Sequence, residues 1–123
     1  MTLIRSISGI RGTIGGKPGE GLTPFDIVRY TSSYASLLKE NPPLNERYRV
    51  VVARDARISG FMCNTLVTGT LISCGIDVVD AGLASTPTAE MAVIFEKADG
   101  GIILTASHNP GEWNALKLLN SRG

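Results

Sequence analysis

The sequence carries almost no excess charge of either sign. Its 123 residues include 12 Lys and Arg and 11 Asp and Glu, which gives a formal net charge of +1 at pH 7. A protein that binds nucleic acid by neutralising phosphates usually has a marked basic excess. The charge balance therefore excludes bulk electrostatic binding of nucleic acid, and any anion site must be local.

Long apolar segments are also absent from the sequence. No run approaches the roughly 18 residues that a membrane-spanning helix needs. Residues 1–12 contain no hydrophobic core of a secretory signal peptide. We therefore expect no membrane partner and a cytoplasmic protein.

Cysteine is scarce, with Cys63 and Cys74 as the two examples. Both fall in one predicted helix, where their separation corresponds to about 16 Å along the helix axis. A disulfide cannot span that distance. We expect two reduced thiols packed in a core.

A length of 123 residues is typical of one domain, so we treat 1–123 as a single domain. Extended and helical patterns alternate along it. The predicted helices cover 24–38 (capped by Thr23 and ended before Asn41), 60–74 and 86–97, and the predicted strands cover 3–7, 49–53, 76–79, 102–105 and an edge strand at 116–119. The continuous apolar run at 49–53 is typical of a strand covered on both faces. We expect an α/β three-layer sandwich, with a mostly parallel mixed sheet of about four strands and helices on both faces.

Glycine is abundant, with 14 residues in the chain. Such a content favours tight turns or a close approach of backbone to a ligand. The glycine-rich stretch at 9–21 is interpreted as irregular structure, and Gly100 and Gly101 as a turn before the strand at 102–105.

Ligands of parallel α/β sheets collect at the carboxyl ends of the strands. Ser107 follows the predicted strand at 102–105 and precedes His108, the only histidine. A serine is a poor nucleophile unless a base, a metal or a covalent modification changes it. An imidazole adjacent in sequence seldom turns back onto the hydroxyl, and no GxSxG motif is present, so a hydrolase triad is not expected. The residues alone leave open that Ser107, His108 and Asn109 only cap a turn before Pro110.

Two cations are candidates for an anion site. Arg11 lies close to glycines, which let backbone N–H groups approach an anion while the guanidinium binds it. Lys117 can bind phosphate or transfer a proton, or it can be a solvated side chain on an edge strand. Arg54 and Arg57, with Asp55 between them, fit a phosphate contact or a structural ion-pair network, and the second interpretation is favoured.

Three segments, SGIRG at 8–12, RDAR at 54–57 and TASHNPGEWNALK at 105–117, occur in this order. Together they resemble the amino-terminal domain of the α-D-phosphohexomutases, over essentially the whole chain. That family contains phosphoglucomutases, phosphomannomutases and phosphoglucosamine mutases. The resemblance implies an intramolecular phosphotransferase, an isomerase that interconverts hexose 1-phosphates and 6-phosphates through a bisphosphate.

The resemblance also implies roles for individual residues. Ser107 would be a phosphoserine that gives its phosphoryl group to the sugar, and such a donor needs no adjacent base. Arg11 and Lys117 would surround the reacting phosphate, with Lys117 and His108 as candidates for proton transfer. Further contacts to phosphate or substrate would come from Ser8, Gly9 and Asn109, and the serine loop would be organised by Asp55 and Arg57.

Cofactors follow from the same resemblance. Magnesium would bind an oxygen of the phosphate on Ser107, in keeping with its preference for hard oxygen ligands. A sugar bisphosphate would act as activator and intermediate. The family commonly has glycine where this chain has Ala53 and Ala115, and the second departure weakens any expectation of close backbone approach there.

The family's metal, sugar and phosphate-binding loops lie in three further domains that are not in this sequence. We therefore expect a first domain whose partners are a phosphosugar and the carboxy-terminal domains of the same protein, and we expect the isolated chain to be inactive. The alternatives are a non-catalytic phosphate-binding or scaffolding module, in which Ser107 is never modified, and a metal-dependent serine phosphatase. The identity of the hexose is not encoded in these residues.

Overall fold

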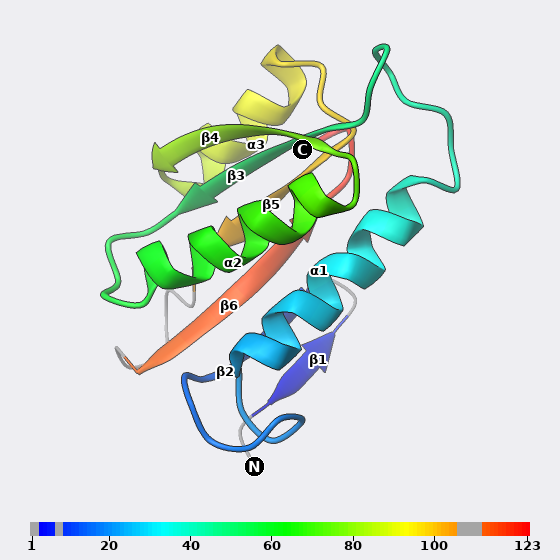
Figure 1. The fold of residues 1–123 in the computed structure, drawn as a ribbon. Coiled ribbons are helices and arrows are strands. Elements are labelled where there is room, and N and C mark those ends of the chain that lie inside the picture. The colour runs from blue at the N-terminus through cyan, green and yellow to red at the C-terminus, as the bar shows by residue number, and fades with distance from the viewer. Residues whose placement is uncertain (1–2, 7–8, 106–111) are drawn as a thin grey trace.

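The computed structural model describes residues 3–6, 9–105 and 112–123. Within these ranges six strands alternate with three helices (Figure 1). Their order is β1 (Ile4–Ser6), β2 (Gly9–Thr13), α1 (Pro24–Leu38), β3 (Arg49–Arg54), α2 (Gly60–Ser73), β4 (Asp77–Leu83), α3 (Thr86–Phe95), β5 (Gly100–Leu104) and β6 (Trp113–Leu119).

The strands form one mixed sheet in the order β1-β2-β6-β5-β3-β4. β3 pairs in parallel with β4 and β5, whereas β6 pairs antiparallel with β5 and β2, and β1 pairs antiparallel with β2. The described part of the sheet therefore has six strands rather than the predicted four, of which β2, β3, β4 and β5 run in the same direction.

Helices cover both faces of the sheet, which confirms the three-layer α/β architecture. α1 and α2 pack side by side on one face, and α3 packs on the other face against β3 and β5, far from β1 and β2 (Figure 1). Val50 and Val52 join the core under α1 and α2, while Val51 joins a second cluster with Val93 of α3. β3 is thus covered on both faces, as its continuous apolar run predicted.

Local signals at the start of α1 explain why its prediction is confirmed. The Thr23 hydroxyl accepts a hydrogen bond from the Asp26 backbone N–H, and the Asp26 carboxylate accepts one from the Thr23 backbone N–H, with Pro24 in the first helical position. α3 ends at Phe95, before the predicted Lys97, because Lys97 has a positive φ of 52° that a helix cannot continue through.

Two glycine-rich segments were predicted wrongly. Residues 9–13 form β2 rather than irregular structure, because β1 and β6 supply hydrogen-bonding partners on both sides. Gly100 and Gly101 begin β5 rather than form a turn. A Cβ atom at position 100 would lie 2.1 Å from the Tyr34 hydroxyl and 2.7 Å from the Leu119 carbonyl oxygen, so close packing, not a turn, requires this glycine.

The last strand also differs from its prediction. β6 begins at Trp113 rather than at Leu116, and it lies between β2 and β5 instead of at an edge. β4 extends to Leu83, beyond the predicted end at Val79. The local sequence does not reveal these differences, because strand neighbours are set by contacts between distant segments.

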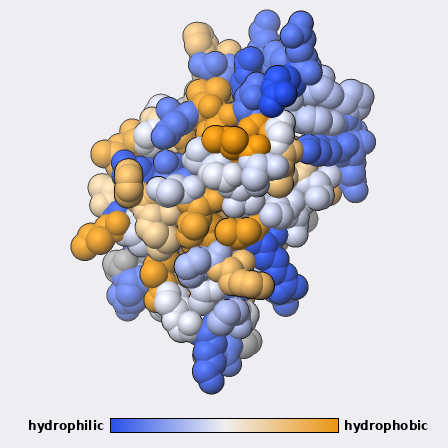
Figure 2. All heavy atoms as spheres, in the orientation of Figure 1, coloured by the Kyte–Doolittle hydropathy of each residue, from blue (hydrophilic) through white to orange (hydrophobic). Residues whose placement is uncertain are grey.

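The surface carries apolar as well as polar side chains. Figure 2 shows apolar patches scattered among polar side chains on the face that carries α1 and α2, where Phe25 and Phe61 begin the two helices and are largely exposed. Both cysteines are free, as expected, with Cys63 buried and Cys74 half-buried. None of the described helices combines the length and apolar character needed to cross a membrane.

Candidate anion-binding site

The neighbouring strands β2 and β6 bring two distant cations onto one face of the sheet. In this pair Gly9 lies opposite Lys117, and Arg11 lies opposite Ala115. Ile10 and Leu116 point into the core under α1 and α2. Because successive side chains of a strand point to opposite faces, Arg11 and Lys117 project from the other face of the sheet.

Small residues stand opposite both cations and leave space around them. Ala115 carries a single methyl group and is buried. A Cβ atom at Gly9, whose φ is +146°, would lie 1.9 Å from the Leu116 carbonyl oxygen, so this close approach of β2 to β6 requires glycine. A cavity of about 290 Å³ opens here, and its lining consists of Ile4, Gly9, Ile10, Arg11, Ala115, Leu116 and Lys117.

The electrostatics of this cavity favour an anion. Within the part of the chain that the structure describes, neither Arg11 nor Lys117 donates a side-chain hydrogen bond or joins an ion pair. The guanidinium fork of an arginine matches two oxygens of a phosphate, and a lysine adds a compact point charge. Two cations that line one cavity, and that pair with no described residue, are therefore suited to a phosphate group.

The loop between β3 and α2 lies beside this site. Arg57 and Asp55 form an ion pair, with Nε 3.1 Å from Oδ2, and the Arg57 side chain is 13% exposed. Arg57 Nη1 donates a hydrogen bond of 3.2 Å to the Trp113 carbonyl oxygen, and the Asp55 backbone N–H donates one of 3.1 Å to the Leu104 carbonyl oxygen. The ion pair thus links the end of β5 to the start of β6.

Four of the sequence-predicted site residues, Ser8, Ser107, His108 and Asn109, lie outside the described residues. The chain on either side of residues 106–111 is anchored in the sheet. Thr105 donates its backbone N–H to Ala115 at 3.1 Å, and Glu112 accepts one from Ile14 at 2.8 Å. The segment that contains Ser107 therefore leaves and re-enters the sheet beside β2 and β6.

Some residues of this region were missed at the sequence level. Ile4 and Ile10 line the cavity although each reads as an ordinary strand residue. Ala115 lies within β6 rather than in a loop. Ser59 and Asn114, which form a hydrogen bond close to the site, were also missed. The available signal was Asn114 itself, a polar residue where the alternation with Leu116 and Leu118 favours an apolar one.

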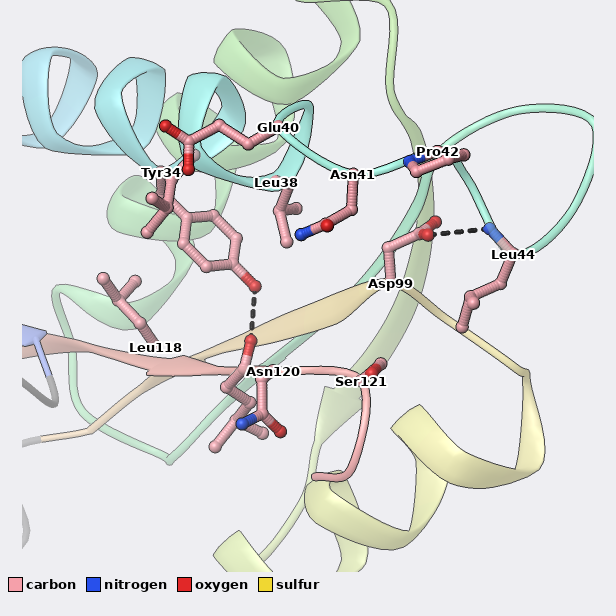
Figure 3. A pocket seen from close by; sticks show the side chains of 12 residues that line it. Tyr34, Leu38, Glu40, Asn41, Pro42, Leu44, Asp99, Leu118, Asn120 and Ser121 are labelled. Carbon is pink, nitrogen blue, oxygen red and sulfur yellow. Dashed lines mark hydrogen bonds between the residues drawn. The ribbon is translucent and has the colours of Figure 1, made fainter.

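A larger cavity, of about 490 Å³, lies at the opposite end of β5 and β6 (Figure 3). Its main polar groups already have partners. The Tyr34 hydroxyl donates to the Leu119 carbonyl oxygen at 2.6 Å, and Asp99 accepts from the backbone N–H groups of Leu44 at 2.9 Å and Arg49 at 2.8 Å. None of the predicted site residues that the structure describes lines it, so we do not regard it as the functional site.

The described ranges contain no group of three or more His, Cys, Asp or Glu side chains that could hold a metal ion. Binding of magnesium by a phosphate on Ser107 stays a prediction.

These features define an α/β/α domain with a candidate anion site between β2 and β6. Residues 3–123 match the family model described as phosphoglucomutase/phosphomannomutase, alpha/beta/alpha domain I. The chain therefore belongs to this family, as the resemblance of its motifs predicted.

Individual relatives agree with this assignment. The chain is 42% identical over 114 residues to a phosphoglucomutase/phosphomannomutase of Thermococcus kodakarensis, and this match covers 91% of the chain but 25% of the relative. It is 36% identical over 115 residues to a phosphoglucosamine mutase of Lactobacillus acidophilus, covering 94% of the chain and 25% of the relative. The chain thus spans about a quarter of the length of these relatives.

A solved structure shares the fold. A phosphoglucomutase/phosphomannomutase family protein from Burkholderia thailandensis superposes with a TM-score of 0.80 at 27% identity. The match covers 94% of this chain and 25% of that one. The similarity therefore concerns one domain of a larger protein.

Proposed function

We propose that this chain is the phosphoserine domain of a phosphohexomutase. In the proposed reaction, the bond between phosphorus and the Oγ of Ser107 breaks as a sugar hydroxyl oxygen bonds to phosphorus. A base takes the hydroxyl proton, while Ser107 Oγ keeps the electron pair of the broken bond and receives a proton from an acid. Lys117 and His108 are the candidates for these two proton transfers. The resulting bisphosphate then returns its other phosphoryl group to Ser107, which completes the interconversion of hexose 1-phosphate and 6-phosphate.

The observation that carries the proposal is that Arg11 and Lys117 line one cavity of about 290 Å³ and form no ion pair with any residue that the structure describes. Phosphoryl transfer depends mainly on positioning and on stabilising charge spread over the phosphoryl oxygens. Cations that are preorganised on neighbouring strands supply both without reorganisation during the reaction. Membership of the family and the anchoring of both flanks of the Ser107 segment beside this cavity support the same assignment.

Further parts of the reaction are proposed to come from outside these residues. Because the chain spans about a quarter of its relatives, we assign sugar recognition and the remaining magnesium ligands to other domains of the same protein. Magnesium bound to the phosphate would neutralise charge that develops during transfer. We therefore expect a cytoplasmic multidomain enzyme and no turnover by the 123-residue chain alone.

The decisive test uses the full-length protein whose first domain this chain forms. After incubation with glucose 1,6-bisphosphate and magnesium, intact-mass analysis should show one added phosphoryl group, and peptide sequencing should place it on Ser107. The Ser107→Ala variant should take up no phosphate and should not interconvert glucose 1-phosphate and glucose 6-phosphate. Ser33→Ala, on exposed α1 surface, provides a matched control that keeps both properties.

Three outcomes would contradict the proposal. A full-length protein that never carries phosphate on Ser107 but binds phosphosugars would be a binding module. Release of inorganic phosphate without any bisphosphate would indicate a serine phosphatase. Turnover by a clean preparation of the isolated chain, abolished by Ser107→Ala, would overturn the expected division of labour between domains.

A further inference from the structure

We propose that Ser59 and Asn114 form a positioning pair that sets the start of β6, and thereby the placement of Lys117 and of the described residues on either side of 106–111, for phosphoryl transfer. The inference rests on the proposed function. Asn114 Nδ2 donates a hydrogen bond of 2.8 Å to Ser59 Oγ, across 55 residues of sequence.

Asn114 occupies a costly place for an amide side chain. It is 0% exposed and shares a face of β6 with Leu116, which belongs to the core under α1 and α2. Burying an amide is unfavourable unless hydrogen bonds replace those made to water. The bond to Ser59 and a bond of 2.9 Å from the Ala115 backbone N–H to Oδ1 meet this requirement. An apolar residue would fill the position without this requirement, so the amide indicates a geometric role.

Ser59 lies at the N-cap of α2, but its side chain does not cap the helix. The side chain makes no capping hydrogen bond, and the Ser59 backbone is helical at φ −75° and ψ −7°. Thr23 and Ser85, the N-caps of α1 and α3, have extended backbones and do cap their helices. The Ser59 hydroxyl instead accepts from Asn114.

The pair completes a three-point attachment of the β3–α2 loop. The loop also bonds to Leu104, the last residue of β5, and through Arg57 to Trp113, the first residue of β6. One loop therefore holds both flanks of the segment that contains Ser107. Since Asn114 lies opposite Gly12 and directly precedes Ala115, which lies opposite Arg11, a shift at Asn114 would also move β6 relative to the cation on β2.

The expected consequence is a slower transfer step with unchanged substrate affinity. A misplacement of about 1 Å can reduce a reaction rate by roughly a hundredfold. The loss of one neutral hydrogen bond should reduce the rate by less than that. We therefore expect Ser59→Ala and Asn114→Ala each to lower the transfer rate about tenfold. Because both variants break the same bond, the double variant should be little slower than either single variant.

The experiment uses full-length protein phosphorylated on Ser107 and mixed with glucose 1-phosphate or mannose 1-phosphate, whichever the wild type converts faster. A single-turnover rate constant describes phosphorylated, folded molecules, so it is insensitive to the fraction that has unfolded. Its dependence on sugar concentration separates affinity from transfer. Ser59→Thr retains a hydroxyl and should restore the rate to within about threefold of the wild type.

Ser85→Ala is the matched control. It removes a serine whose side chain caps α3 by accepting a hydrogen bond from the Thr88 backbone N–H, and so stabilises that helix. It should lower the melting temperature and leave the transfer rate constant unchanged. Should Asn114→Ala fail to fold, the comparison of Ser59→Ala with Ser59→Thr still decides the question. A wild-type rate in Ser59→Ala, or equal loss in Ser59→Thr and Ser59→Ala, overturns the positioning role alone. A wild-type protein that cannot donate phosphate from Ser107 overturns the proposed function and this inference with it.

Discussion

Gly9 lies so close to Leu116 that a Cβ atom at position 9 would sit 1.9 Å from the Leu116 carbonyl oxygen. Gly9 belongs to β2, the second strand along the chain, and Leu116 belongs to its partner β6, the last strand. The contact fixes β2 against β6 at the point where Lys117 faces the cavity.

The first prediction concerns this contact. Gly9→Ala should separate β2 from β6 and lower the free energy of unfolding by about 2 kcal/mol or more, because backbone atoms cannot move aside as a flexible side chain can. Chemical denaturation of the 123-residue chain measures the change. Gly69→Ala is the control, since its added Cβ would meet no atom within 4 Å apart from its chain neighbours and the backbone of its own helix, and alanine favours the helix by about 0.5–1 kcal/mol. Equal stability of Gly9→Ala and the wild type would contradict the close approach.

The second prediction concerns anion binding by the isolated chain. Arg11→Met and Lys117→Met should each weaken binding of inorganic phosphate about tenfold, the effect expected when a charge-assisted hydrogen bond is lost. NMR titration at constant ionic strength measures the affinity and locates the responding amides. Lys17→Met removes an exposed cation that does not line the cavity and should have little effect. If all three variants weakened binding equally, the interaction would be non-specific.

The third prediction concerns pH. Burial alone would raise the pKa of Asp26, but hydrogen bonds from the Thr23 hydroxyl and backbone and from the Gly19 backbone outweigh it and hold the pKa below its usual value. A lowered folded-state pKa stabilises the fold above the unfolded-state pKa, and this contribution is lost as the pH falls through the folded-state pKa. Asp26→Asn should therefore destabilise the chain by about 2 kcal/mol at pH 7.

The difference between wild type and Asp26→Asn should shrink as the pH is lowered below 3.8, the ordinary pKa of an aspartate, where the unfolded-state carboxylate takes up a proton first. Urea denaturation at several pH values gives both curves. Asp77→Asn, at an exposed ion pair with Arg47, is the control and should change stability little at any pH. A difference that stays constant down to strong acid would refute the assignment to Asp26.

The fourth prediction concerns the thiols. Burial, with a smaller contribution from the Asp55 carboxylate, raises the pKa of Cys63 to about 11. Cys63 therefore has little thiolate at neutral pH, and its sulfur is also inaccessible in the folded chain. A chromogenic disulfide reagent should react with half-buried Cys74 first and reach Cys63 only through unfolding. Rapid labelling of Cys63 in a Cys74→Ser variant under native conditions would be inconsistent with this packing.

How far the sequence predicts the fold depends on where each signal lies. α1 was predicted closely because Thr23, Pro24 and Asp26 are neighbours in the chain and mark its start. The sequence did not predict β2, nor that β6 lies inside the sheet, because both depend on pairing with strands that are distant in the sequence. A glycine at position 100 suggests a turn locally, whereas its actual cause is the Tyr34 ring on another layer.

Some features of the candidate site could likewise be predicted from the sequence, and others could not. Arg11 and Lys117 were singled out by residue type and motif, but their shared face follows from the burial of Ile10 and Leu116 on the other side of the sheet. The bond between Ser59 and Asn114 could not be predicted, because neither residue indicates which partner the other will meet.

The position of β6 has a consequence for the order in which the domain forms during synthesis. Among the described strands, β2 bonds only to β1 and β6, and β6 is the last to leave the ribosome. Pairing across so much intervening chain carries a large loop-closure cost and is slow to form. β3, α2 and β4 can pack against one another earlier, whereas the strand that carries Arg11 can pair with β6 only after β6 has been synthesised. The candidate anion site is therefore completed only when β6 pairs with β2, and a nascent chain that stops before residue 113 lacks Lys117 and the strand that carries it.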